Sequence, residues 1–164
     1  MGNRAVVTFA NKNQLEKYLN DASRPMHLEG YVKDHPYAIG VYLHWNGGYD
    51  SVKSFCMACK ELGYRNPVGD DYGIACFVML VRNFFGIDGL SVGVDVLSRL
   101  DCDNGDNGVF VVDDEWDIIG REYENYEQTN SDDYYEKFKD YLVGMSKAME
   151  EARKKFDLES RQSK

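Results

Sequence analysis

Hydrophobic residues recur along the chain at two spacings, and each spacing predicts a different kind of element. Spacings of three and four residues, typical of amphipathic helices, occur at about 50–62, 70–85 and 134–156. Short runs of β-branched and aromatic residues predict strands at 5–9, 39–45, 90–96, 109–112 and 116–121, the last two as a hairpin. Asn11 or Asn13 is expected to cap a further short helix that ends near Leu19. The segment 23–37, which holds two of the three prolines, is interpreted as a loop.

The order of these elements predicts the fold class. Strands and helices do not alternate regularly, which argues against a doubly wound parallel sheet. We expect an α+β fold with a mainly antiparallel sheet of about five strands, two central helices packed on it, and a long C-terminal helix. The chain then divides into a core domain at 1–128 (with 11–37 as a helix and loop excursion), a C-terminal helix at 129–157 and a polar tail at 158–164.

The expected C-terminal helix carries an apolar stripe over about six turns. A stripe of this length either closes the core of the domain or forms the seam of a homodimer. The sequence favours closing the core and leaves the homodimer open. The stripe consists of Tyr134, Phe138, Tyr141, Leu142, Met145, Ala148, Met149 and Phe156.

Charge is distributed unevenly along the chain. The net charge is −9, yet the segment from Asp101 to Glu136 alone holds thirteen acidic residues and a single base, Arg121. Aromatic residues lie among these acids, so the segment is not a plain disordered acidic tract. A folded surface of this charge repels nucleic acid and anionic membranes and attracts basic partners over about 8–10 Å at physiological salt.

The acidic segment is the first candidate binding site. Clustered like charges destabilise an isolated fold, so their persistence suggests that they bind something basic. The alternative is a solvated surface with a flexible loop. The carboxylates that we expect to contact a basic partner, with Trp116 and Tyr123 as apolar anchors among them, are Asp113, Asp114, Glu115, Asp117, Glu122 and Glu124.

A second candidate site lies between the strand at 39–45 and the helix that follows it. Paired glycines before a helix allow backbone N–H groups to surround an anion. The run Asn46-Gly47-Gly48-Tyr49-Asp50-Ser51 resembles the phosphate loop of ATP pyrophosphatases (the PP-loop family), with Asn46 in place of the first serine. This resemblance implies phosphate contacts by Gly47, Gly48, Asp50 and Ser51, and Trp45 and Tyr49 could stack a base. The simpler interpretation is that Asp50 or Ser51 caps the helix.

Other motifs give weaker signals. The loop Asp101–Gly108 has the composition of a calcium loop but lacks the ligand spacing of an EF-hand, so ordinary turn chemistry is favoured. Cys56 and Cys59 form a Cys-x-x-Cys pair, but both fall on the apolar face of a helix, which favours buried thiols over a zinc or redox site. His44 is interpreted as a structural histidine. We assign no catalytic residue, metal or cofactor.

Several short runs together resemble a known group of proteins. They are Met1-Gly-Asn-Arg-Ala-Val-Val-Thr, Ile39-Gly-Val-Tyr-Leu-His-Trp-Asn-Gly-Gly, Ser51-Val, Asn83-Phe-Phe-Gly, Leu100-Asp-Cys-Asp-Asn-Gly-Asp-Asn-Gly and Ile119-Gly-Arg-Glu. Residues 1–10 and 38–124 thereby resemble small uncharacterised proteins of prophages and other mobile elements in Gram-positive bacteria. Small acidic proteins of such elements often resemble inhibitors of host defence, including anti-CRISPR proteins. The resemblance implies a context and carries over no functional residues.

These observations favour a non-enzymatic phage or mobile-element protein that inhibits a host defence system. It would present its acidic surface to the basic, nucleic-acid-binding groove of a host protein. The alternative is a small-molecule binding protein that sequesters or senses a phosphorylated nucleotide at Asn46–Ser51, and a PP-loop-like enzyme is a third option. The chain shows no signal peptide and no membrane-spanning run, and its four cysteines are expected to be reduced, so we expect it in the cytoplasm of a bacterial host cell.

Overall fold

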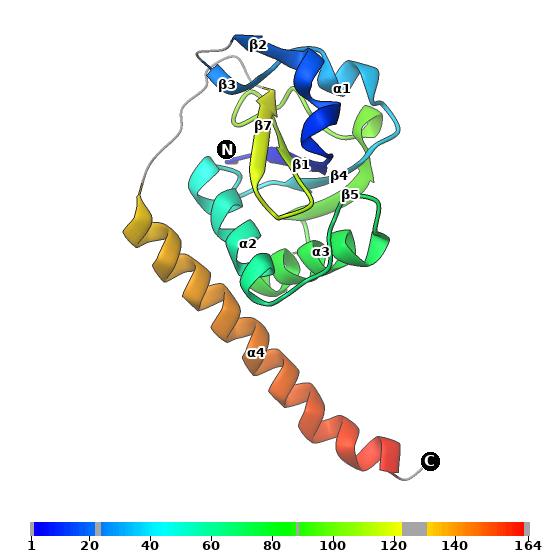
Figure 1. The fold of residues 1–164 in the computed structure, drawn as a ribbon. Helices are drawn as coiled ribbons and strands as arrows, with labels where there is room; N and C mark the ends of the chain where they lie inside the picture. The colour runs from blue at the N-terminus through cyan, green and yellow to red at the C-terminus, as the bar shows by residue number, and fades with distance from the viewer. Residues whose placement is uncertain (1, 22–23, 88, 123–130, 163–164) are drawn as a thin grey trace.

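The protein has an α+β fold (Figure 1), and its computed structural model describes residues 2–21, 24–87, 89–122 and 131–162. A seven-stranded sheet has the order β2-β3-β7-β6-β1-β4-β5. The strands are β1 Ala5–Phe9, β2 Leu19–Asp21, β3 Arg24–Leu28, β4 Ile39–Leu43, β5 Val92–Val96, β6 Val109–Val112 and β7 Ile118–Glu122. The helices are α1 Tyr31–Asp34, α2 Tyr49–Glu61, α3 Asp71–Phe85 and α4 Asp132–Gln162, with 3-10 helices at Lys12–Gln14, Glu16–Tyr18 and Leu97–Arg99.

The sheet is mixed but mainly antiparallel, as predicted. Strand β1 lies near its centre, parallel to β6 and antiparallel to β4, and the other parallel pair is β3 with β7. Strands β2 and β3 were not predicted, because 11–37 was expected to be a helix followed by a loop. The sequence gives little sign of them, since β2 has three residues and β3 meets β7 at one registered pair, His27 with Arg121.

Both faces of the sheet are covered. Helices α2 and α3 pack on one face, and Figure 1 shows α1 with the early part of the chain on the other. Strand β6 is buried on both faces. Phe110 and Val112 lie in the core beneath α2 and α3. Val111 packs on the opposite face with Leu28 and Tyr31. A strand buried on both faces reads as a continuous apolar run.

Helix α4 completes the core with its first half. Tyr135 and Leu142 are buried, and the ring of Phe138 contacts Phe55 of α2 and Phe84 of α3. The prediction that this helix closes the core is therefore confirmed for its N-terminal half. The helix continues to Gln162, so most of the segment expected as a polar tail is helical. Figure 1 shows the C-terminal half of α4 projecting beyond the rest of the molecule.

Candidate functional site

The turn between β6 and β7, Asp113–Asp117, carries four carboxylates, and we call it the acidic turn. Asp113 organises it, because its Oδ1 accepts hydrogen bonds from the backbone N–H groups of Glu115 and Asp117, both at 2.9 Å. The side chains of Asp114, Glu115 and Asp117 are exposed. Aspartate turn chemistry thus holds the backbone and leaves three carboxylates in solvent.

Trp116 lies in the middle of the acidic turn but points into the core. It is 4% exposed, its ring stacks on that of Phe77 at 6.1 Å, and its Nε1 donates to the carbonyl oxygen of Tyr64 at 3.3 Å. The expectation that it anchors a partner is therefore wrong for this conformation. An indole with a satisfied N–H and stacked neighbours stabilises the fold instead.

Glu122 and the loop Asp101–Gly108 lie at the opposite end of the hairpin, since Glu122 pairs with Val109. At the rise of a β-strand this places them roughly 13 Å from the acidic turn. Glu122 accepts hydrogen bonds from the backbone N–H groups of Tyr31 and Val32, at 3.0 and 3.2 Å. Its carboxylate is therefore already engaged within the fold. Tyr123 and Glu124, also expected in the binding surface, fall outside the described residues.

Two of the three carboxylates of the loop Asp101–Gly108, those of Asp101 and Asp106, are neutralised from within the chain. The Nε of Arg4 donates to Asp106 at 2.8 Å and its guanidinium lies 3.6 Å from Asp101. Hydrogen bonds from Arg4 hold the pKa of the Asp106 carboxyl below its usual value. The predicted acidic surface is therefore divided. Among its expected carboxylates that the structure describes, those of the acidic turn lie together and Glu122 lies apart from them.

The loop Asp101–Gly108 is held by the buried side chain of Asn104. Its Oδ1 accepts hydrogen bonds from the backbone N–H groups of Asp106, Asn107 and Gly108, each at 3.1 Å. Its Nδ2 donates to the carbonyl oxygens of Asp101 and Gly108. Among the described residues, no group of three or more His, Cys, Asp or Glu side chains converges to hold a metal ion. The amide of Asn104 thus shapes this loop.

Two further acids lie at the same end of the sheet as the acidic turn. Asp70 caps α3 by accepting the backbone N–H of Tyr72 at 2.9 Å, and Asp71 is the first residue of that helix. Trp116 links the acidic turn to α3 through its stacking on Phe77. Within the described residues, this end carries two ion pairs, Lys60 with Asp117 and Arg65 with Asp70. The sequence analysis missed Asp70 and Asp71 as members of this surface, because they lie outside the acidic segment.

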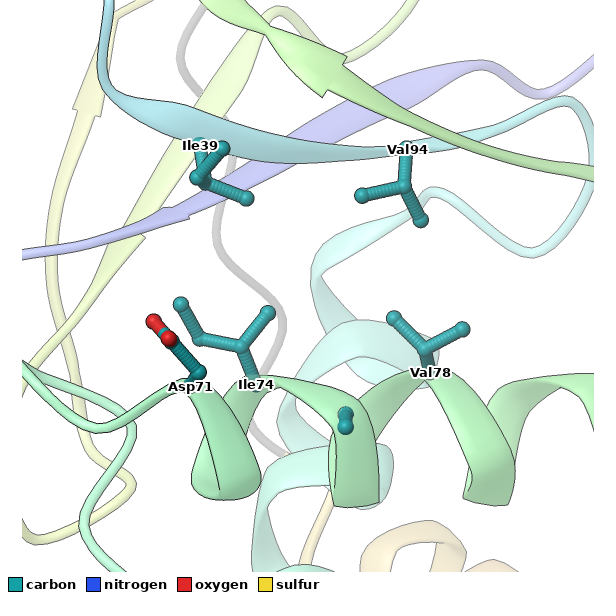
Figure 2. Close-up of a pocket in the computed structure, with 6 residues that line it drawn as sticks. Ile39, Asp71, Ile74, Val78 and Val94 are labelled. Atoms are coloured by element: carbon teal, nitrogen blue, oxygen red, sulfur yellow. The ribbon is translucent and has the colours of Figure 1, made fainter.

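An apolar pocket opens beside these acids, between α3 and strands β4 and β5. Its volume is about 380 Å³, within the usual range of ligand sites. Figure 2 shows Ile39 and Val94 pointing from the strands toward Ile74 and Val78 of α3, with Asp71 at one end. Ile39 and Val94 are 42% and 50% exposed, so α3 leaves this corner of the sheet partly open.

The pocket and the acidic turn are close. The hydroxyl of Thr8 in β1 donates to the carbonyl of Ile39 at 2.8 Å, and the next residue, Phe9, pairs with Val112, which precedes the acidic turn. The pocket mouth and the turn are thus two strand spacings apart, about 10 Å. At this distance the carboxylates of the turn act on a charge bound at the pocket.

Strand β5 forms the outer edge of the sheet next to the pocket. His44 donates to the carbonyl of Ser91, and Leu97 donates to that of Ala38. In an antiparallel ladder hydrogen-bonded pairs alternate, so the N–H and C=O groups of Val92 and Val94 point away from β4, toward the open edge. Beyond them, the backbone N–H of Val96 is covered by the Asp95 carboxylate at 2.8 Å. Among the described residues, no hydrogen bond engages the N–H or C=O groups of Val92 and Val94, so the part of the edge beside the pocket can pair with another strand.

The loop Asn46–Ser51 is occupied by contacts of the fold. The N–H of Gly47 donates to the carbonyl of Asn3 at 2.8 Å, and a Cβ at Gly47 would lie 2.5 Å from that oxygen. The glycine is therefore required by the close approach to the N-terminal strand. Helix α2 is capped by Gly48 without a side-chain cap, so the expected cap by Asp50 or Ser51 is wrong.

The first turn of α4 covers the same loop. The hydroxyl of Tyr135 donates to Asp50 at 3.3 Å, and the hydroxyls of Tyr134 and Ser51 lie 3.3 Å apart. Tyr49 is buried, whereas Trp45 beside the loop is half-exposed. The N-terminus of α2, which would attract phosphate, thus carries the Asp50 carboxylate and is covered by Tyr134 and Tyr135. Nucleotide binding there stays a prediction with no geometric support.

The cysteine pair and His44 have structural surroundings. Cys56 and Cys59 are buried as predicted, and burial raises the pKa of both thiols well above the usual value. Nδ1 of His44 lies 2.8 Å from the hydroxyl of Tyr42, and its ring meets that of Trp45 edge to face. Among the residues that the structure describes, no group of three or more His, Cys, Asp or Glu side chains gathers around the thiols or the imidazole.

Comparison with family models, curated proteins and solved structures gives no match to this chain. Among the helices that the structure describes, none combines the length and apolar character required to cross a bilayer. The class of the protein is therefore defined by its own geometry: an α+β domain with a mixed sheet, whose open edge strand lies beside an apolar pocket and a group of carboxylates.

Proposed function

We propose that the protein is a non-catalytic binding protein that captures an extended basic segment of a partner protein along β5. In this arrangement the segment adds a strand to the open edge and inserts one apolar side chain into the pocket. The observation that carries the proposal is the position of the pocket, which lies directly beside Val94 of the edge strand.

Strand addition explains why a pocket and an edge would occur together. Main-chain hydrogen bonds to an edge give affinity, and pockets for alternate side chains give specificity. The walls of the pocket are aliphatic on both sides, so they fit a branched aliphatic side chain such as valine or isoleucine. Its single carboxylate, Asp71, suits a lysine or arginine next to that side chain in the partner.

The negative charge around the pocket is the reason that we propose a basic partner. Asp70, Asp71 and the acidic turn together carry six carboxylates at this end of the sheet, and the ion pairs described above engage two of them. Complementary charge accelerates encounter and selects among partners more than it increases affinity. This retains the basic protein partner expected from the sequence but moves the contact to the pocket side of the acidic turn.

The biological setting follows from the resemblance to mobile-element proteins and is part of the proposal. The partner would be a basic, nucleic-acid-binding protein of a bacterial host, and binding would inhibit it in a defence pathway. The protein would then act in the host cytoplasm. An inhibitor of this kind needs no cofactor.

The direct test uses short fluorescent peptides and measures binding by fluorescence anisotropy at low and high salt. We expect a peptide that alternates lysine with valine to bind, more weakly as salt rises. Peptides that replace lysine by glutamate, or valine by serine, should not bind. Equal binding of the glutamate peptide would contradict the proposal.

Matched variants locate the contact. Ala75→Trp fills the pocket without changing charge and should weaken binding about tenfold or more, whereas Met79→Trp, one turn further along α3, should not. Binding that is equal in the two variants would exclude the pocket.

A charge-reversed triple variant tests the electrostatic part of the proposal. Asp71→Lys, Asp114→Lys and Glu115→Lys together should remove the salt dependence of peptide binding. A control triple at exposed positions elsewhere, Glu29→Lys, Asp103→Lys and Asp140→Lys, changes the net charge equally and should preserve it. The same two variants used as bait in host lysate identify the partner as the protein that only the reversed triple fails to retain.

A further inference from the structure

The C-terminal half of α4 is a separate candidate for a binding surface. From Lys147 to Gln162 the helix extends about 24 Å at 1.5 Å per residue. Every side chain from Lys147 to Phe156 is exposed, including Met149 at 55% and Phe156 at 75%. A helical segment of this length is marginal in water without packing, so its apolar side chains call for a partner.

The apolar side chains of the projecting half continue the face that packs on the body. Tyr135 and Leu142, seven residues apart, are buried against α2. Met149 and Phe156 continue the same seven-residue spacing beyond the point where α2 ends. Ala148 and Ala152 lie beside them, so the exposed stripe alternates large and small side chains.

The charges beside this stripe differ on its two sides. On one side Arg153 pairs with Asp157 at 2.6 Å, and further round the helix Lys154 pairs with Glu150 at 3.4 Å. On the other side lie Glu151 and Lys155. Within the part of the chain that the structure describes, no ion pair engages either of these two residues. Among the described side chains, the flank of Arg153 and Asp157 is thus neutralised internally, and the flank of Glu151 and Lys155 carries no such ion pair.

We propose that the projecting half of α4 pairs with the same segment of a second copy of the chain, in antiparallel orientation about a two-fold axis near Ala152. The two alanines allow the helices to approach closely, and Phe156 of one copy then packs over Ala148 of the other. Antiparallel pairing brings the same flank of each helix together. Glu151 of one copy therefore faces Lys155 of the other, and the two-fold axis repeats this ion pair.

The charges on the two flanks of the helix favour the antiparallel pair over a parallel one. Parallel helices place opposite flanks together. Glu151 and Lys155 would then meet the flank of Arg153 and Asp157, whose charges already neutralise each other. The antiparallel pair instead brings the Glu151 and Lys155 flanks of the two copies together, so that each copy contributes both charges. The proposal is independent of the pocket, because the interface and the pocket share no residue.

Sedimentation velocity of the full chain, over a roughly hundredfold range of concentration, tests the proposal by mass action. The wild-type chain should pass from monomer to dimer as concentration rises. Met149→Glu with Phe156→Glu should remain monomeric at every concentration. These side chains are exposed, so the circular dichroism of the variant should match that of the wild-type chain at concentrations low enough for the wild type to be monomeric. A wild-type chain that is monomeric throughout, or a double variant that still dimerises, overturns the proposal.

Charge exchange tests the antiparallel orientation. Glu151→Lys alone and Lys155→Glu alone should each weaken dimerisation about tenfold. The double variant Glu151→Lys with Lys155→Glu should restore it, and Lys147→Glu, on the opposite side of the helix, should have no effect. A double variant as weak as the single ones would exclude the antiparallel pair. Dimerisation that is insensitive to all four changes would place the interface elsewhere.

Discussion

Replacing Asn104 by alanine should destabilise the fold more than any other single change in the loop Asp101–Gly108. The side chain is 3% exposed and makes five hydrogen bonds to backbone groups at 3.2 Å or less. A net value of about 1 kcal/mol for each gives about 5 kcal/mol. We expect a smaller loss, about 3 kcal/mol in the free energy of unfolding. Water that enters this surface loop can form hydrogen bonds with some of the backbone groups that lose the Asn104 amide.

The effect should spread to the N-terminal strand. Gly108, one of the residues that Asn104 holds, accepts the backbone N–H of Val6 at 2.9 Å, and the N–H of Asn107 donates to the carbonyl of Arg4 at 3.1 Å. Loss of the amide therefore loosens the position of β1 as well as the loop. Hydrogen exchange should report faster exchange at Val6 than at buried amides of α2.

Urea denaturation followed by circular dichroism measures the predicted loss. The midpoint should fall while the slope stays constant, because the same surface is exposed on unfolding. Asp103→Ala, at the exposed neighbouring position, is the matched control and should change stability by less than about 0.5 kcal/mol. A loss below about 1 kcal/mol for Asn104→Ala, or equal losses in the two variants, would refute the assignment of this loop to the amide.

Four further predictions follow from the described contacts. Trp116→Ala should reduce stability by about 3–5 kcal/mol in urea denaturation, as expected for a buried core indole; an unchanged midpoint would contradict its burial. Cys56 and Cys59 should react with a thiol reagent only as fast as the protein unfolds, since burial raises the pKa of both; rapid labelling of either would show that it is accessible. The pKa of Asp106 is lowered in the folded state, so its contribution to stability is present above its unfolded pKa and is lost as the pH falls through the lowered value. Asp106→Asn should therefore flatten the acid side of the stability profile. A thermal-shift screen with mononucleotides and cyclic nucleotides should give no shift through Asn46–Ser51, and a stabilisation of about 2.7 kcal/mol at a hundredfold excess over the dissociation constant would revive nucleotide binding there.

Periodicity predicted the elements that are long or buried on a full face. Strands β1, β4 and β6 and helices α2 and α3 all lie within a few residues of their predicted positions. Each of these elements carries several apolar residues at one spacing, so a single polar residue in the series does not hide the pattern. Strands β2 and β3 carry no such pattern, because they are short and pair irregularly, with a register shift between Leu19 and Asp21. Strand β3 pairs with the distant strand β7, and β2 joins the sheet through β3, so neither pairing can be read from the local sequence.

The pocket could not be predicted, because its walls come from three distant parts of the chain. Ile39 begins β4, Ile74 and Val78 lie on α3, and Val94 lies in the edge strand. Each of these residues fits an ordinary apolar position in its own element. These residues form a pocket because α3 leaves the corner formed by β4 and β5 partly uncovered. That offset is a property of packing between elements and leaves no local signal.

The division of the acidic segment has a simple geometric cause. A hairpin reverses the chain, so acids that follow one another in sequence are sent alternately to opposite ends of β6 and β7: Asp106 to one end, Asp113 and Asp117 to the other, and Glu122 back to the first. Arg4 then neutralises Asp106 from more than a hundred residues away in the sequence. The summed charge of a segment therefore describes the electric field far from the molecule. The charge of the surface that contacts a partner depends instead on where the chain reverses direction. For this protein that reasoning leaves the acidic turn and its neighbours on α3 as the contact that a basic partner would meet.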